Sequence, residues 1–114
     1  MALFKKKNDS YSEASSALNN SQSAADRLYI TKMEDDDELA KSLVDKLRNG
    51  TPIILNFADM DRVAQNKMLA FMAGAACALD GKSYMINTTT YLFARRVDFL
   101  DGSLQDFIQN LPKK

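Results

Sequence analysis

The residue types that most often carry enzyme chemistry are scarce in this sequence. It contains no histidine, which removes the commonest general base and the commonest ligand of transition metals. Cys77 is the only cysteine, and a thiol nucleophile without histidine lacks its usual activating partner. We therefore expect Cys77 to be a buried helix residue, as free cysteines usually are. The sequence predicts a protein that is not an enzyme.

An acidic run at residues 34–38, Glu-Asp-Asp-Asp-Glu, is the cluster that could suggest a cation site. It lacks the alternating aspartates, the central glycine and the distal glutamate of a calcium-binding loop. The run instead favours the start of a helix, where negative charge complements the helix dipole. Gly50 and Gly74 stand outside any glycine-rich phosphate-binding pattern. We predict no metal and no cofactor.

Composition limits the remaining classes of function. Fifteen basic residues balance fifteen acidic ones, whereas a dedicated nucleic-acid binder normally carries a concentrated basic excess. The length of 114 residues fits one domain. No apolar run approaches the roughly 18 residues that span a bilayer. We expect a soluble or peripheral protein.

The chain divides into three segments. Residues 1–7 form a short apolar and cationic tip, a candidate for membrane binding. The tip contributes two apolar residues and three lysines: Leu3, Phe4, Lys5, Lys6 and Lys7. Residues 8–25 are rich in Ser, Asn, Ala and Gln, which predicts a flexible polar linker. Residues 26–112 have the pattern of a folded domain. Composition alone also fits a solvated, disordered start in place of a membrane tip.

Within the domain, strand and helix patterns alternate. Residues 28–31 predict a first strand, and apolar residues three and four apart from Leu39 to Leu47 predict a helix that stops at Gly50. Residues 53–57 predict a buried strand. A second helix follows Asp59 or Asp61, and its apolar side is predicted from seven residues. These are Val63, Ala64, Met68, Phe71, Met72, Ala75 and Ala76.

The last third of the chain predicts two more strands. Residues 83–86 and 91–94 are β-prone and are joined by a short polar turn. Residues 97–99 could add an edge strand, and Ser103 could cap a last helical turn. The predicted fold is a compact two-layer α/β sandwich of β-α-β-α-β-β order, with a small mixed sheet and two main helices. Small residues on the second helix allow another element to approach closely, inside the fold or across a subunit contact.

Several short motifs follow one another in a characteristic order. Asn56-Phe57 ends an apolar strand, and a helix runs into Ala-Phe-Met-Ala-Gly at residues 70–74. Cys-Ala-Leu-Asp-Gly follows at residues 77–81, then Thr-Tyr-Leu-Phe at residues 90–93 and Val-Asp at residues 97–98. This order of motifs resembles the SepF family of bacterial cell-division proteins. The resemblance needs no gap from residue 70 to residue 98 and extends more weakly back to the first strand.

This resemblance implies a homodimer of α/β sandwiches, able to polymerise further, that acts in division septum assembly. Such a protein would lie in the cytoplasm, peripheral at the inner face of the membrane at the division site. It would bind the C-terminal tail of the tubulin-like GTPase FtsZ and reach the anionic membrane through the tip. The implied partner groove involves Tyr91, Met85 and Phe93, and the implied dimer or packing contacts are Gly74 and Gly81.

The sequence departs from the family pattern at four positions. Ala70 replaces an aspartate, Asn87 a common glycine, Arg95 a proline and Met85 a residue that is often basic. The last change would weaken attraction for an acidic tail. Three alternatives therefore stay open. Tyr91 and Phe93 could simply be sheet core, and the domain could instead be a small regulatory ligand-binding module with no membrane role, or an RNA-associated domain.

Overall fold

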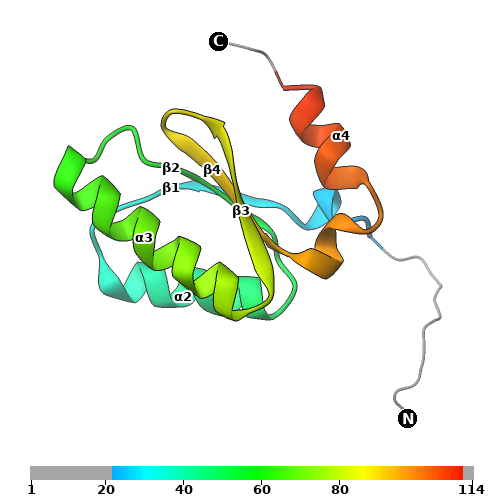
Figure 1. The fold of residues 1–114 in the computed structure, drawn as a ribbon, viewed down its shortest axis with the longest axis horizontal. Coiled ribbons are helices and arrows are strands. Elements are labelled where there is room, and N and C mark those ends of the chain that lie inside the picture. The colour runs from blue at the N-terminus through cyan, green and yellow to red at the C-terminus, as the bar shows by residue number, and fades with distance from the viewer. Residues whose placement is uncertain (1–21, 112–114) are drawn as a thin grey trace.

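The computed structural model describes residues 22–111. Its helices and strands follow the predicted alternation of β-α-β-α-β-β and add a C-terminal helix (Figure 1). The elements are the 3-10 helix η1 (Ala25–Arg27), β1 (Tyr29–Lys32), α2 (Asp37–Arg48), β2 (Ile53–Asn56), α3 (Arg62–Ala78), β3 (Gly81–Asn87), β4 (Thr90–Arg95), the 3-10 helix η2 (Arg96–Phe99) and α4 (Ser103–Gln109). The predicted α/β fold class is confirmed.

The four strands form one mixed sheet in the order β1-β2-β4-β3. β1 runs parallel to β2, with Ile30 opposite Ile54, and α2 makes the crossover between them. β4 runs antiparallel to both β2 and β3. β2 and β4 are therefore the central strands, whereas β1 and β3 lie at the two edges of the sheet.

Helix α2 begins where the acidic run predicted. The Asp36 carboxylate accepts hydrogen bonds from the backbone N–H groups of Glu38 and Leu39, which caps the helix. Ala40, Leu43 and Leu47 form its buried side. The helix ends before Gly50, whose positive φ of 94° suits a glycine.

Helix α3 begins after Asp61, whose side chain accepts from the backbone N–H of Ala64. Its fully buried side is narrower than the sequence predicted, because it consists of Met68, Met72 and Ala76. Val63 and Phe71 are exposed, so their assignment to the buried side was wrong. Each residue turns the helix by about 100°, which places Val63 opposite Met72 and Phe71 about a quarter turn away.

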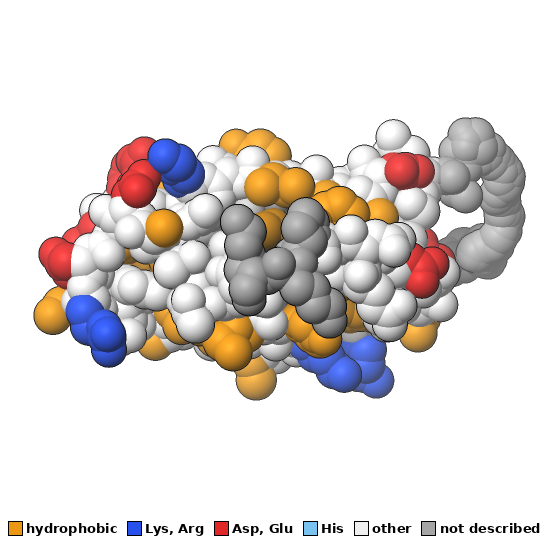
Figure 2. Space-filling model, turned by 90° about the horizontal axis from the view of Figure 1, so that it is seen from above, with side chains coloured by type: hydrophobic (Ala, Val, Ile, Leu, Met, Phe, Trp, Pro, Cys, Tyr) orange, Lys and Arg blue, Asp and Glu red, His pale blue; other side chains and the backbone are white. Residues whose placement is uncertain are grey.

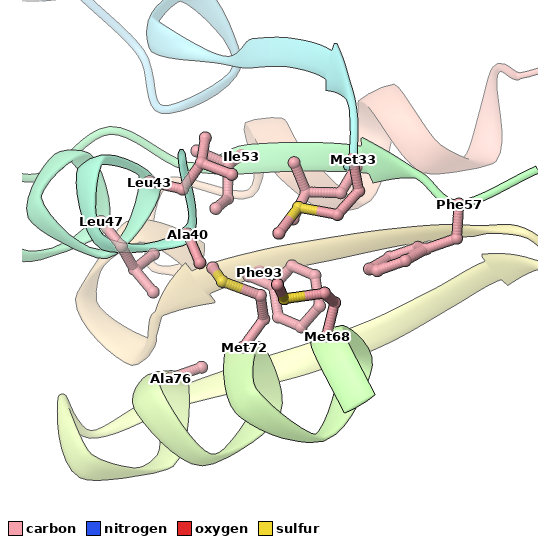
Figure 3. Close-up of a cluster of buried hydrophobic side chains, with 11 residues drawn as sticks. Met33, Ala40, Leu43, Leu47, Ile53, Phe57, Met68, Met72, Ala76 and Phe93 are labelled. Carbon is pink, nitrogen blue, oxygen red and sulfur yellow. The ribbon is translucent and has the colours of Figure 1, made fainter. Parts of the chain in front are cut away.

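The main core lies between the sheet and the layer formed by α2 and α3. Met68 and Met72 reach from α3 toward Phe93 of β4, while Leu43 of α2 lies beside Ile53 and Leu47 belongs to the same cluster (Figure 3). Phe57, directly after β2, closes one end of this cluster (Figure 3).

A second cluster covers part of the opposite face of the sheet. Ile54, Leu92 and Ala94 point to this side and pack with Ala24 and Leu104. Figure 1 shows α4 beside the sheet on the side away from α2 and α3. The fold thus has a partial third layer in addition to the two that were predicted.

Residues 22–25, the end of the predicted linker, lie within the described part of the chain. Ala24 is buried there, and its backbone N–H donates to Asp101 Oδ2 at 2.9 Å. The N–H of Ala25 donates to Ser103 Oγ at 2.9 Å. These contacts attach the start of the domain to the beginning of α4.

The segment between β4 and α4 differs from the prediction in two details. Residues 97–99 belong to η2 and not to an edge strand. The cause is Asp98, whose buried carboxylate accepts from Arg95 Nε at 3.1 Å and from Arg27 Nη2 at 2.8 Å, which holds the chain in a turn. Ser103 is the first residue of α4 and not its N-cap, because its N–H and its hydroxyl both donate to Asp101 Oδ1.

Candidate partner-binding surface

Tyr91 and Met85 are neighbours across the β3–β4 pair, on the side of the sheet that carries α3. They stand directly opposite each other in the register of the two strands. Tyr91 is half-buried and packs edge-on against Phe57, with ring centroids 5.8 Å apart. Met85 is 58% exposed because β3 is an edge strand. The pair combines a fixed aromatic ring with an accessible flexible thioether, which is a suitable surface for an apolar side chain of a partner.

Phe93 belongs to the core and not to this surface. The alternation of β4 does place it on the same side as Tyr91, as predicted, with 6.4 Å between the ring centroids. However, β4 is a central strand, and Phe93 lies between Ile53 and Ser83 with no exposed area. A partner cannot reach its side chain in this conformation. The Phe93 ring instead stacks against Tyr91 from within the core.

The two predicted contact glycines differ in their surroundings. Gly81 is a packing position, because a Cβ added there would lie 2.5 Å from the carbonyl oxygen of Ala94 and 3.0 Å from that of Ala76. Gly74 lies on the exposed side of α3, and an added Cβ would meet nothing within 4 Å. Of these two glycines, therefore, Gly81 is the one needed for close packing.

Cys77 is exposed, which corrects the prediction that it is buried. It lies well over a quarter turn of α3 away from the line of Met68, Met72 and Ala76. The five residues of the tip, from Leu3 to Lys7, lie outside the described residues.

Charged groups near the start of α2 and α3 form ordinary surface pairs. Lys32 Nζ lies 2.9 Å from Asp59, and Lys67 Nζ lies 2.7 Å from Asp35. The hydrogen bond to its aspartate, and then the attraction of the opposite charge, raises the pKa of each lysine. Across residues 22–111 no three potential metal ligands come together.

Hydrophobic side chains also reach the surface in separate patches (Figure 2). On the edge strand β3 these include Tyr84, which points to the opposite face from Met85. In the described part of the chain no helix has the length and apolar character needed to cross a bilayer.

A sequence model of the family described as "Cell division protein SepF" matches residues 28–96, from the start of β1 to the end of β4. The chain belongs to the SepF family. The match includes Tyr91, Met85, Gly74 and Gly81, so the surface described above lies within the family domain. The description of the family names cell division.

Individual SepF proteins agree with this assignment at modest identity. The chain is 28% identical to Cell division protein SepF of Carboxydothermus hydrogenoformans over 67 residues, which cover 59% of this chain and 49% of the relative. It is 34% identical to the SepF protein of Kocuria rhizophila over 74 residues, covering 64% and 43% of the two chains. A third relative, SepF 2 of Desulforamulus reducens, is 30% identical over 73 residues, covering 62% and 45%. The chain spans about half the length of the curated SepF relatives that it matches.

The residues of a second surface, on the opposite face of the sheet, were not found from the sequence. Lys82 and Tyr84 of β3, Arg96 of η2 and Ile108 of α4 line a groove on the opposite face of the sheet. Only the alternation of β3 could have shown that Tyr84 and Met85 face opposite sides. The position of α4 beside β3 has no signal in the local sequence.

Proposed function

We propose that this SepF-family protein is a non-enzymatic adaptor that ties the C-terminal tail of FtsZ to the membrane at the division site. The observation that carries the proposal is the exposed Met85 beside the half-buried Tyr91, inside the region that matches the family. A short peptide can place an apolar side chain over such a pair. Tyr91 would supply the rigid contact, with Phe57 and Phe93 holding its ring.

The membrane end of the proposed adaptor is the tip at residues 1–7. Leu3 and Phe4 would enter the headgroup region, while the three lysines that follow would meet anionic lipids. Each lysine near such a surface contributes roughly 1 kcal/mol. One tip is therefore a weak anchor, and stable attachment requires several linked copies.

Self-association would supply those copies, and the exposed side of α3 is the surface we propose for it. Gly74 leaves room for close approach, and Phe71 is 46% exposed beside a cleft between α2 and α3. The cleft is lined by both signs of charge, Asp37 together with Lys41 and Lys67. A two-fold axis can pair such a surface with itself, because each acidic residue then faces a basic one.

Co-sedimentation with liposomes tests the adaptor in one experiment. The full chain is mixed with anionic liposomes and a labelled synthetic FtsZ tail peptide, beside a version that lacks residues 1–7. We expect the full chain to pellet and to bring the peptide with it, and the shortened version to bind peptide without pelleting. If neither lipid nor peptide binds, the adaptor function is refuted, and a small-molecule screen of the domain would test the ligand-binding alternative.

A substitution at Met85 tests the peptide site without disturbing the core. Met85→Lys adds a positive charge at an exposed position and should tighten the binding of an acidic tail by a few-fold at low salt. Leu100→Lys adds the same charge at another exposed apolar residue and serves as the matched control. Fluorescence anisotropy measures both. Equal tightening by the two variants would mean that net charge, and not this site, governs binding.

A further inference from the structure

A groove lies between β3, η2 and α4, on the face of the sheet opposite the Met85–Tyr91 pair. It is lined by Lys82 and Tyr84 from β3, Arg96 and Phe99 from η2, and Gln105 and Ile108 from α4. Its volume is about 190 Å³, whereas pockets for drug-sized ligands measure roughly 300–1,000 Å³. The groove therefore has room for a side chain rather than for a metabolite.

The groove runs beside a strand edge that the described chain leaves open. Among residues 22–111, β3 pairs only with β4, so the outer backbone N–H and C=O groups of β3 have no partner strand. Tyr84 is 49% exposed at the junction of edge and groove. An open edge of seven residues can pair with an extended peptide, which gains main-chain hydrogen bonds there.

The charge of the groove indicates which kind of peptide it suits. Its lining contains two cations, Lys82 and Arg96, and no carboxylate. No carboxylate of the described residues lies within ion-pair distance of Lys82, whereas Arg96 pairs with the exposed Asp80. An incoming carboxylate would therefore complete a charge pair at Lys82.

A second copy of the chain is a poorer match for this edge. The sequence of β3, Gly-Lys-Ser-Tyr-Met-Ile-Asn, carries one cation and no acid. Two β3 strands that pair with each other bring two lysines to the same small sheet and supply no carboxylate. Nucleic acid is also disfavoured, because two cations beside an apolar groove provide few phosphate contacts.

We propose that the free edge of β3 binds an extended, acidic segment of another protein as an added strand. One apolar side chain of that segment enters the groove against Tyr84 and Ile108, and a carboxylate beside it pairs with Lys82. This site faces away from Met85 and Tyr91, so it does not depend on the FtsZ-tail site and adds a second binding function to the domain.

The probe is a fluorescein-labelled peptide of about nine residues that alternates apolar and polar positions, with glutamate at three of the polar ones. Its counterpart carries lysine in place of glutamate. Anisotropy with the full chain should show saturable binding of the glutamate peptide only. Lys82→Glu should weaken that binding tenfold or more, as expected when a charge-assisted pair becomes a repulsion. Arg62→Glu, at an exposed cation in the first turn of α3, is the matched control and should leave it nearly unchanged.

Amide hydrogen exchange distinguishes an added strand from simple charge attraction. Bound glutamate peptide should slow exchange at outward-facing amides of β3 and leave those of the other edge strand, β1, unchanged. The proposal is overturned if the two peptides bind equally, if neither binds up to about 1 mM, if both charge variants weaken binding alike, or if β3 gains no protection. The same variant, Lys82→Glu, should still bind the FtsZ tail peptide. That result would show that the proposed adaptor function stands even if no peptide binds the β3 edge.

Discussion

The buried carboxylate of Asp98 should be a principal source of stability in this fold. It is 4% exposed and accepts three hydrogen bonds from two arginines. Arg27 also donates from Nε to the carbonyl oxygen of Gly50 at 2.9 Å. The cluster thus joins η1, the end of α2, β4 and η2, which are far apart in the sequence.

Replacing Asp98 with asparagine removes the charge and keeps the shape. A hydrogen bond to a charged group contributes about 1.5–3 kcal/mol, and removing one partner from a buried pair costs about 3–5 kcal/mol. Both arginines keep about a third of their side chains exposed and can regain water. We therefore expect Asp98→Asn to lower the free energy of unfolding by about 2–4 kcal/mol, and Tm by roughly 8 °C or more.

Urea and thermal unfolding followed by circular dichroism measure this loss. Asp45→Asn is the matched control, because Asp45 pairs with Arg48 at 2.6 Å with both side chains more than half exposed. Such surface pairs contribute about 0.2–1 kcal/mol. If the two substitutions cost the same within about 0.5 kcal/mol, the Asp98 cluster does not hold these four elements together, and our reasoning on it is refuted.

Two further predictions concern glycine packing and acid stability. Gly81→Ala should lower the free energy of unfolding by about 1–3 kcal/mol, since its Cβ would overlap backbone oxygens. Gly74→Ala should instead stabilise α3 by up to about 1 kcal/mol, because its Cβ would meet no other atom. Urea unfolding measures both variants, and equal effects would contradict the difference in packing. At Asp101, burial raises the pKa, but hydrogen bonds from Ser103 and Ala24 outweigh it and lower the pKa below its ordinary value of 3.8. The folded state therefore favours the carboxylate, and its contribution is complete above pH 3.8 and lost as the pH falls through the lower folded value. The Tm difference between wild type and Asp101→Asn should shrink below about pH 4, and a difference that grows there would contradict this sign.

The local elements could be predicted because their signals are local. Helix α2 begins after Asp36, whose carboxylate caps it, and ends before Gly50, which has a positive φ. Both signals depend on a few adjacent residues. Residues 53–57 indicated a buried strand by their unbroken apolar character, and β2 (Ile53–Asn56) is buried at its first three positions. In contrast, the contact between Arg27 and Asp98 spans 71 positions, and nothing at either residue indicates its partner.

For the candidate site, the sequence predicted which residues share a face of a strand, but not which of them are exposed. Alternation placed Tyr91 and Phe93 on one face of β4, which their stacked rings confirm. Strand order decides whether a residue on that face is accessible, and order is a property of the whole sheet. Because β4 lies inside and β3 at the edge, Phe93 is buried while Met85 is exposed. Cys77 was expected to be buried because free cysteines usually are, but its position on α3 turns it away from the line of Met68, Met72 and Ala76.

The attachment of residues 24 and 25 to α4 has a consequence for the proposed adaptor. The hydrogen bonds from Ala24 to Asp101 and from Ala25 to Ser103 fix the start of the described chain on the face opposite α2 and α3. The Met85–Tyr91 pair lies on the α3 side of the same sheet. In the proposed adaptor, the segment that leads to the tip would therefore start on one face of the sheet. The site for the FtsZ tail would lie on the opposite face. The domain would then act as a spacer between membrane and filament, and neither contact would obstruct the other.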